Sequence, residues 1–310
     1  MWYNMELIKG LIKMLEGYLS DFGFNKSQIN HVLNSYSIYK SNKYTIYNLI
    51  KTNNEWFISH GFSKQEIIKM VTIVPSIYTF SSNKIQTNYD YFISFGYTEE
   101  QTHKIFSRTP QVIGLSIENI KEKLGYLFNL GYTKEQIIKI TYLLPPIIGY
   151  SIENIESKIS NYNSLGLSNE DIIKMSLTTC CVYSISEDNV NTKINNLIDL
   201  GFTYEEVIKM IKLFPPILGL SIETIKEKID FYRELNILDF IIRNPKYLMQ
   251  SVSLSYARYM FYLMEKNDVI NSNTSRRLFV GDKQFSKQFK VTKEELLKRY
   301  SYEESRSRLC

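Results

Sequence analysis

The sequence is poor in the residues that build disulfide frameworks and metal sites. Its 310 residues include only three cysteines and three histidines. Cys180 and Cys181 are adjacent, Cys310 is terminal, and the histidines lie far apart in the chain. An odd number of cysteines without a CxxC pair argues against a disulfide framework and against a zinc site. We therefore expect reduced thiols and no bound cofactor.

The sequence also lacks the marks of membrane and exported proteins. No apolar run approaches the roughly 18 residues of a membrane span. Residues 1–21 include three acidic residues and no arginine, which is typical of an amphipathic helix, here capped by Gly23, rather than of a transit peptide. We therefore predict a cytoplasmic protein that does not bind membranes.

Patterns of catalytic residues are missing as well. The chain has no recognisable pair of catalytic carboxylates, no nucleophile–base arrangement and no phosphate-binding loop. We therefore predict that the protein is not an enzyme.

What the sequence does contain is a repeat of 35 residues. A glycine and a serine recur at this interval, and a proline recurs at all steps but one. The positions are Gly61, Gly96, Gly131, Gly166 and Gly201; Ser81, Ser116, Ser151, Ser186 and Ser221; and Pro75, Pro110, Pro145 and Pro215, with Cys180 at the missing step. A fixed period of this length indicates a solenoid, in which neighbouring units share one core.

Each repeat predicts two helices separated by a proline. In the third repeat, Thr133 and Gln136 have the spacing of a capping box that begins a helix, and Pro145 ends that helix. Ser151 is a good N-cap for the second helix, which ends at the next glycine in a left-handed cap. Capping-box spacing also occurs at Ser63/Glu66, Thr98/Gln101, Ser168/Asp171, Thr203/Glu206 and Thr292/Glu295. The fold class predicted is an all-α solenoid.

The repeats suggest three regions. Residues 1–60 form an N-terminal cap and an imperfect first repeat, with Ser37 at the proline position. Residues 61–270 hold the regular repeats and a shortened last one, in which Pro245 follows Pro215 by 30 residues. Residues 271–310 form a basic C-terminal segment with a last helix at about residues 292–300. Terminal repeats are usually atypical because one of their faces meets water.

The net charge of +5 arises entirely in that last region. Residues 271–310 hold 10 Lys and Arg against 5 Asp and Glu, which leaves 27 of each sign in residues 1–270. Basic tails attract anionic partners, above all nucleic acids, and this makes Arg276 and Arg277 candidate contacts. The alternative is a solvated helix followed by a frayed end.

Lysines recur with the same period on both helices of the repeat. They are Lys69, Lys104, Lys139, Lys174 and Lys209 on the first helix, and Lys123, Lys158, Lys193 and Lys228 on the second. A stack would align them in two ridges, and such a ridge could follow a phosphate backbone. Acids three residues before some of them (Glu66, Asp171 and Glu206) favour solvated intrahelical ion pairs instead. We prefer the second interpretation for these lysines.

Charges beside two of the prolines break the apolar pattern. Arg108 and Arg243 lie two residues before Pro110 and Pro245, and Gln111 and Lys246 directly follow these prolines. Turn residues of a solenoid line an edge or an inner face, and arginine grips phosphate with two parallel hydrogen bonds. The equivalent positions in the middle repeats are apolar or small, so such contacts would be discontinuous.

The pattern G-[FY]-[ST]-x-x-[EQ]-I-I-K-M, followed by P-x-I-x-G-x-S-I-E-x-[IL]-x-x-K-[IL], resembles the repeat of the mitochondrial transcription termination factor family, mTERF. Arg258 in SLSYARYMFYLMEKN and the RRLFVGDKQFSKQF that follows are similar to the closing repeat and tail of that family. The resemblance extends over about residues 20–302 and includes five repeats in register.

The resemblance implies a right-handed half-ring of three-helix repeats, with a short 3₁₀ turn after the proline. It implies nucleic-acid binding, mostly to double-stranded DNA along a basic groove, in transcription termination or initiation, ribosome assembly or RNA splicing. It also implies a mitochondrial location as the alternative to the cytoplasm. Carried over by position, the candidate phosphate contacts are Arg108, Gln111, Arg243, Lys246 and Arg258.

Other functions fit parts of the pattern. Pentatricopeptide repeats share the period but lack the proline and the capping-box start, so they rank lower. A protein-binding scaffold would suit the neutral repeat region and the 24 tyrosines, and RNA binding in RNA processing or ribosome assembly is a further alternative. We predict a monomer that binds nucleic acid, double-stranded DNA in preference to RNA, and regulates transcription.

Overall fold

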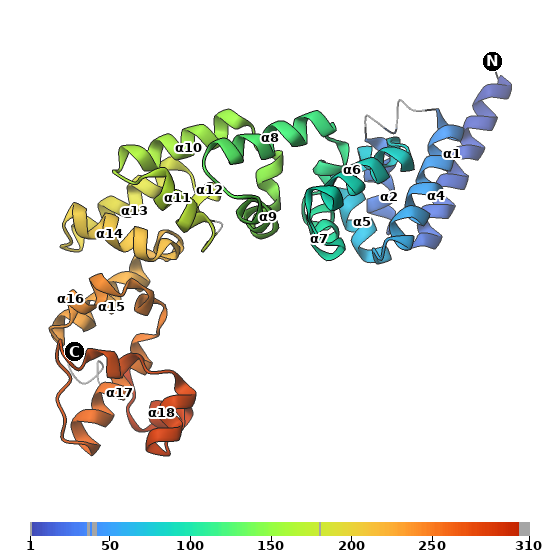
Figure 1. Ribbon diagram of the computed structural model, residues 1–310. Coiled ribbons are helices and arrows are strands. Elements are labelled where there is room, and N and C mark those ends of the chain that lie inside the picture. The colour runs from blue at the N-terminus through green and yellow to red at the C-terminus, as the bar shows by residue number, and fades with distance from the viewer. Residues whose placement is uncertain (1, 36–37, 39–41, 180, 304–310) are drawn as a thin grey trace. The chain divides into compact units, whose positions relative to one another are not determined.

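The computed structural model describes residues 2–35, 38, 42–179 and 181–303 of the chain. All regular elements in these residues are helices, which confirms the all-α prediction. Ser37, Cys180 and Cys310, considered above, lie outside the described residues, as do Arg306 and Arg308 of the basic segment. The chain divides into two compact units, Met1–Ile155 and Glu156–Cys310, and each is described by itself (Figure 1). The three regions suggested by the repeats remain a prediction.

Unit 1 contains α1 (Trp2–Phe22), α2 (Lys26–Asn34), α4 (Lys43–Ser59), α5 (Lys64–Ile73), α6 (Ser82–Phe95), α7 (Glu99–Arg108), α8 (Ile117–Asn129), α9 (Lys134–Leu143) and the start of α10 (Ile152–Ser164). Its 3₁₀ connectors are η1 (Pro75–Thr79), η2 (Pro110–Gly114) and η3 (Pro145–Gly149). The first helices of successive repeats pack side by side, in the order α2, α5, α7 and α9. The connectors also pack against one another, so equivalent positions of neighbouring repeats lie in rows.

Unit 2 contains the rest of α10, then α11 (Asn169–Ser176), α12 (Cys181–Ser184), α13 (Glu187–Asp199), α14 (Tyr204–Leu213), α15 (Ile222–Glu234), α16 (Leu238–Arg243), α17 (Val252–Glu265), α18 (Asp282–Phe289) and α19 (Lys293–Arg299). Its 3₁₀ segments are η4 (Pro215–Gly219), η5 (Pro245–Met249) and η6 (Ser275–Phe279). First helices α11, α14 and α16 form one row, and second helices α13, α15 and α17 form another. Helix α19 packs back onto α17.

Capping explains where the first helices begin. The backbone amide of Thr133 donates to Gln136 Oε1 at 2.9 Å, and the amide of Gln136 donates to Thr133 Oγ1 at 3.3 Å. All six predicted capping boxes form in this way. The periodic serines cap the second helices, as when Ser116 Oγ accepts from the amide of Asn119 at 3.1 Å. Local spacing in the sequence is sufficient to fix these ends.

The prolines set the connector between the two helices. Leu144 before Pro145 is extended (φ −129°), as steric contact with a following proline requires, and the helix ends there. Residues 145–149 then form the 3₁₀ turn η3, which buries Ile147 and Ile148. The repeat without a proline instead has the single α-helical turn α12, which packs against η4. The connector is therefore part of the core rather than a solvated loop.

Each regular repeat ends in the same backbone motif. At the end of α6, the amide of Tyr97 donates to the carbonyl of Phe92 at 3.1 Å and that of Gly96 to Ile93 at 3.0 Å. This is a Schellman motif, and it holds Gly96 at φ 111°. The rings of Phe92 and Tyr97 pack against each other 5.2 Å apart, which is the apolar contact typical of the motif. In the shortened repeat Asn236 (φ 54°) takes the place of the glycine.

Helix α18 is an element that the apolar periodicity does not predict. Its inner side consists of two aromatic residues four positions apart, the buried Phe285 and the half-buried Phe289. Their ring centroids lie 5.3 and 5.1 Å from that of Phe261 on α17. One aromatic pair is too short a pattern to indicate a helix from sequence, and Gly281 at the N-cap has no side chain that could mark its start.

Candidate nucleic-acid interface

The junction of α7 and η2 presents two polar side chains. Arg108 ends α7 and Gln111 is the second residue of η2, and both are exposed. Thr109 and Pro110 between them are buried. The two polar side chains therefore extend into solvent on either side of one tight turn. Neither forms a hydrogen bond or ion pair within the described part of the chain, so both are available to a ligand.

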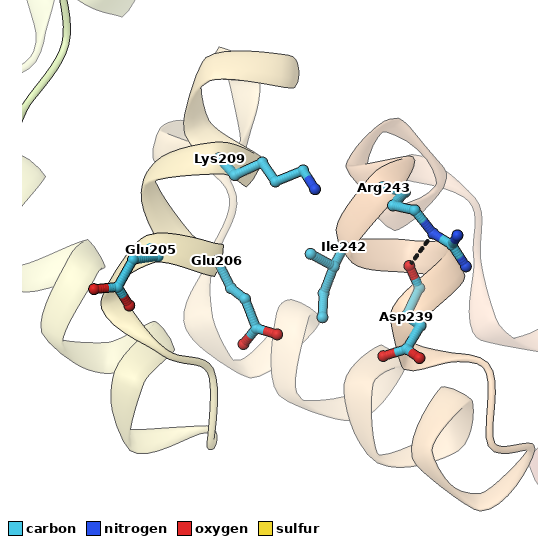
Figure 2. Close-up of a pocket in the computed structure, with 6 residues that line it drawn as sticks. All are labelled: Glu205, Glu206, Lys209, Asp239, Ile242 and Arg243. Carbon is cyan, nitrogen blue, oxygen red and sulfur yellow. Dashed lines mark hydrogen bonds between the residues drawn. The ribbon is translucent and has the colours of Figure 1, made fainter.

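Arg243 and Lys246 occupy the same two positions at the junction of α16 and η5. Both are exposed. Arg243 Nε donates to the carbonyl oxygen of Asp239 at 3.0 Å, one helical turn earlier (Figure 2). The two terminal guanidinium nitrogens remain without a hydrogen bond to any described residue. Lys246 Nζ lies 5.2 Å from the centroid of the Tyr247 ring.

A pocket of about 420 Å³ lies between α14 and α16, beside Arg243. Figure 2 shows the residues that line it: Glu205, Glu206, Lys209, Asp239, Ile242 and Arg243. Three carboxylates face two cations, so the pocket itself has a negative balance and disfavours phosphate. At the position of Asp239, α7 carries Lys104. The surroundings of Arg108 are therefore more favourable to an anion than those of Arg243.

The first-helix lysines of unit 1 lie on the surface that carries Arg108. Lys69 and Lys139 are exposed, and Lys104 Nζ lies 3.5 Å from the centroid of the Tyr142 ring. Lys104 is four residues before Arg108, which places both on one face of α7. Because α5, α7 and α9 pack side by side, these side chains form one series, which we call the basic row: Lys69, Lys104, Arg108 and Lys139.

The predicted ion pairs between the first-helix lysines and the acids three residues earlier do not form within the described part of the chain. Lys174 instead forms an exposed intrahelical pair with Glu170, four residues earlier, at 2.6 Å. Glu66 accepts from the Ser63 amide at 2.9 Å and lies 3.4 Å from His103 Nε2. Asp171 instead pairs with Lys212 at 2.7 Å. That hydrogen bond from Lys212, with others from Ser168, lowers the pKa of Asp171 against the opposing effect of burial. The acids are occupied by capping, so the lysines of the basic row keep their charge uncompensated.

The second-helix lysines point inward instead of forming a second basic ridge. Lys158 Nζ donates to the carbonyl oxygen of Ile185 at 2.7 Å, just after the next connector. Lys123, Lys193 and Lys228 donate to the carbonyls of Tyr150, Leu220 and Leu248 in the same manner. Burial lowers the pKa of Lys158, Lys193 and Lys228. The idea that these lysines follow a phosphate backbone, and the idea that they are solvated, are both wrong.

The same repeat position is occupied by a side-chain N–H donor in both units. Asn53 Nδ2 donates to the carbonyl of Phe80 at 2.9 Å, and Asn88 Nδ2 to that of Leu115 at 3.0 Å. We call this the inter-repeat donor position: Asn53, Asn88, Lys123, Lys158, Lys193, Lys228 and Arg258. Each donor links its second helix to the connector of the next repeat. The signal in the sequence is a column that contains only Asn, Lys and Arg.

Arg258 is the last member of this column and is not presented to solvent. It follows Lys228 by 30 residues, the same shortened step that separates Pro215 from Pro245. Its side chain is 2% exposed. Its Nη1 donates to the carbonyl of Leu278 at 2.8 Å, and its Nη2 to Asp282 Oδ1 at 2.6 Å. This placement does not favour the phosphate contact predicted for Arg258 and gives it a structural role instead.

A family model for mTERF matches residues 6–164 and again residues 153–286. The two matches together span almost the entire repeat region. The chain belongs to the mTERF family. No curated protein sequence matches it significantly. The family is one of nucleic-acid-binding helical-repeat proteins that act in gene expression, and its members are often organellar.

The two tail arginines of this mTERF protein differ in their surroundings. Arg276 in η6 is exposed and has no ion-pair partner among the residues that the structure describes. Arg277 forms an ion pair with Asp268, and its guanidinium carbon lies 5.8 Å from the Tyr262 ring centroid. Arg276 is therefore the stronger candidate for a contact with an anionic ligand.

The described residues of the mTERF chain include neither a metal-binding cluster nor a membrane-spanning helix. No three His, Cys, Asp or Glu side chains among them come together as a metal site would require. None of the described helices combines the length and apolarity needed to cross a membrane.

Proposed function

We propose that this mTERF protein binds double-stranded DNA in preference to RNA, as a monomer, and regulates transcription at termination or initiation. The observation that carries the proposal is the basic row of unit 1. Its four cations come from three neighbouring helices, and none has a carboxylate partner in the described part of the chain. Such a series binds phosphates with release of counterions, which makes the affinity strongly dependent on salt.

The test is a titration of the full chain with labelled duplex DNA, single-stranded DNA and duplex RNA over a range of KCl concentrations. We expect the tightest binding to duplex DNA. Arg108→Gln should lower the slope of log affinity against log salt by about 0.9, the effect of one lost phosphate contact. Arg243→Gln should lower it less, because three carboxylates line the pocket beside Arg243. Lys226→Gln is the matched control, because Lys226 is exposed on α15, away from the connectors.

Three results would change the proposal. Absence of binding to all three nucleic acids at low salt would contradict it. Tighter binding to RNA than to duplex DNA would favour RNA processing or ribosome assembly. Imaging of a tagged chain distinguishes the cytoplasmic location predicted from sequence from the mitochondrial location that the family suggests.

A protein-binding scaffold is the second candidate, and a separate observation favours it. The helix position held by Arg108 and Arg243 is occupied in other repeats by Ile73, Leu143 and Leu213, which are 50%, 39% and 53% exposed. Exposed aliphatic residues that recur at one position of the repeat suit a protein partner. Under this function, Leu143→Ser and Leu213→Ser would abolish co-purification of a partner protein and leave nucleic-acid affinity unchanged.

A further inference from the structure

Helix α18 carries positive charge on one face only. Lys283, Lys287 and Lys290 are spaced by four and three residues, which places them along one side of the helix, and all three are exposed. Asp282 is the only acidic residue of α18. The opposite side is formed by Phe285 and Phe289, which pack against α17. We call the three lysines the α18 basic face.

The carboxylate of Asp282 does not neutralise this face. Its Oδ1 accepts a hydrogen bond from buried Arg258 at 2.6 Å, and its Oδ2 lies 3.7 Å from Lys293 Nζ. Both oxygens are therefore directed to cations outside the α18 basic face. The three lysines form no hydrogen bond or ion pair with any residue in the described ranges.

The other basic residues of the C-terminal segment are mostly paired. Arg277 pairs with Asp268, and Arg299 Nη1 lies 3.0 Å from Glu265 Oε1. Among the described residues of this segment, only Arg276 and Lys298 share the unpaired state of the α18 lysines. Three of the five unpaired cations in the described part of this segment thus lie on α18 or at its C-cap.

The fold gains little from this arrangement, because Lys287 and Lys290 suit the negative end of the helix dipole but Lys283 lies at its positive end. Like charges at i and i+4, such as Lys283 and Lys287, destabilise a helix. Lys290 adopts the left-handed conformation (φ 59°) at the C-cap, a position that favours glycine or asparagine. A capping surface needs only to be polar, and mixed charges would serve folding better. Three cations on one exposed face therefore indicate an anionic ligand.

We propose that the α18 basic face is a second phosphate-contacting surface, which binds the backbone of a nucleic acid. The inference rests on the proposed function. Charge complementarity identifies the ligand, because a duplex presents one phosphate charge about every 1.7 Å along its axis. Lysines bind phosphate as point charges and do not select bases, so this surface adds affinity without sequence preference.

The test removes the three charges from the full-length protein with Lys283→Gln, Lys287→Gln and Lys290→Gln together. The matched control is Lys13→Gln, Lys26→Gln and Lys51→Gln, three exposed lysines of unit 1 outside the basic row. With labelled duplex DNA, we expect the α18 triple variant to bind about tenfold more weakly or worse. Its salt slope should fall by up to about 2.7, as for three lost contacts. The control should match the wild type.

The outcomes separate this inference from the function on which it rests. If Arg108→Gln lowers the salt slope and the α18 triple variant does not, the α18 inference is wrong and DNA binding stands. Equal losses in both triple variants would indicate a general charge effect and also overturn it. If the wild type binds no nucleic acid, the proposed function itself fails. Replacing the three lysines by arginine should preserve affinity, which excludes misfolding of α18 as the cause of a loss.

Discussion

The lysines of the first helices and those of the second helices share one period and have opposite surroundings. Lys139 on α9 is exposed, whereas Lys158 on α10 donates to the carbonyl of Ile185. The difference lies in what each faces. The last carbonyls of a helical turn lack intrahelical partners and accept a nearby ammonium group. Periodic charge therefore identifies a repeat, and the neighbouring repeat determines whether that charge is available to a ligand.

The largest effect on stability is expected from removing Arg258, the last cation of the inter-repeat donor position. Arg258→Ala removes a buried side chain and its hydrogen bonds to Asp282 and the Leu278 carbonyl. Because a cavity remains in its place, we expect the free energy of unfolding to fall by about 3 kcal/mol. Urea denaturation measures this loss. The control is Arg299→Ala, which removes an exposed pair with Glu265 and should cost less than about 1 kcal/mol. Equal small effects in both variants would contradict a structural role for Arg258.

A milder change compares an inward and an outward lysine on one helix, α15. Lys228→Met leaves the Leu248 carbonyl without its donor, and we expect a loss of about 1 to 2 kcal/mol in unfolding free energy. Lys226→Met alters an exposed side chain and should change stability by less than about 0.5 kcal/mol. Thermal or urea unfolding distinguishes the two. A stabilised Lys228→Met variant would mean that the cost of burying the charge exceeds the benefit of the hydrogen bond.

The comparison can also be sharpened by DNA binding. Lys139→Gln removes a cation of the basic row and should lower the salt slope of affinity by about 1. Lys158→Gln removes the same charge from the inward series and should leave the slope unchanged, because its ammonium group is not available to phosphate. Anisotropy titrations with labelled duplex, run beside a check of folded content, give both values. Equal salt slopes for Lys139→Gln and Lys158→Gln would contradict the distinction between outward first-helix lysines and inward second-helix lysines.

The smallest expected effect is a dependence on pH. Burial lowers the pKa of Lys228 from its ordinary value near 10.5, with Glu227 opposing the shift. Between the folded pKa and 10.5 the unfolded chain binds more protons, so the unfolding free energy rises with pH in this window. The stability advantage of wild type over Lys228→Met should therefore grow as pH rises toward 10.5. Tyr232, whose pKa burial raises to about 12, is present in both proteins and cancels in the difference.

Lys226→Met supplies the control for this pH series. Its stability relative to wild type should stay constant over the same window, because Lys226 is exposed. A constant advantage of wild type over Lys228→Met would show that burial of Lys228 does not affect its protonation.

The parts of the fold that depend on neighbours in sequence could be predicted. Thr133 and Gln136 lie three residues apart and cap each other directly, so their pattern is visible in the sequence. Pro145 restricts the residue before it, and Gly131 supplies a left-handed end at φ 103°. Such devices act within a few residues and hardly depend on tertiary structure.

The candidate site was less predictable because its residues depend on partners far away in sequence. Arg258 and Arg108 are the same residue type, and the two acceptors that hold Arg258 inward, Leu278 and Asp282, lie 20 and 24 residues further on. Aligning the repeats would have indicated this, since Arg258 falls in one column with Asn88 and Lys123. No such alignment points to the α18 basic face, because α18 has no regular repeat beside it.

The inter-repeat donor position also sets the order in which the repeats can be linked during synthesis. Lys158 leaves the ribosome 27 residues before its acceptor Ile185, and Arg258 leaves 20 residues before Leu278. A nascent chain that has just completed one repeat therefore still lacks the link that fastens it, and gains the link only when the following connector emerges. Each inter-repeat hydrogen bond can thus form only after the next connector has been synthesised, and the hydrogen bond from Arg258 to Leu278 is the last of the series to form.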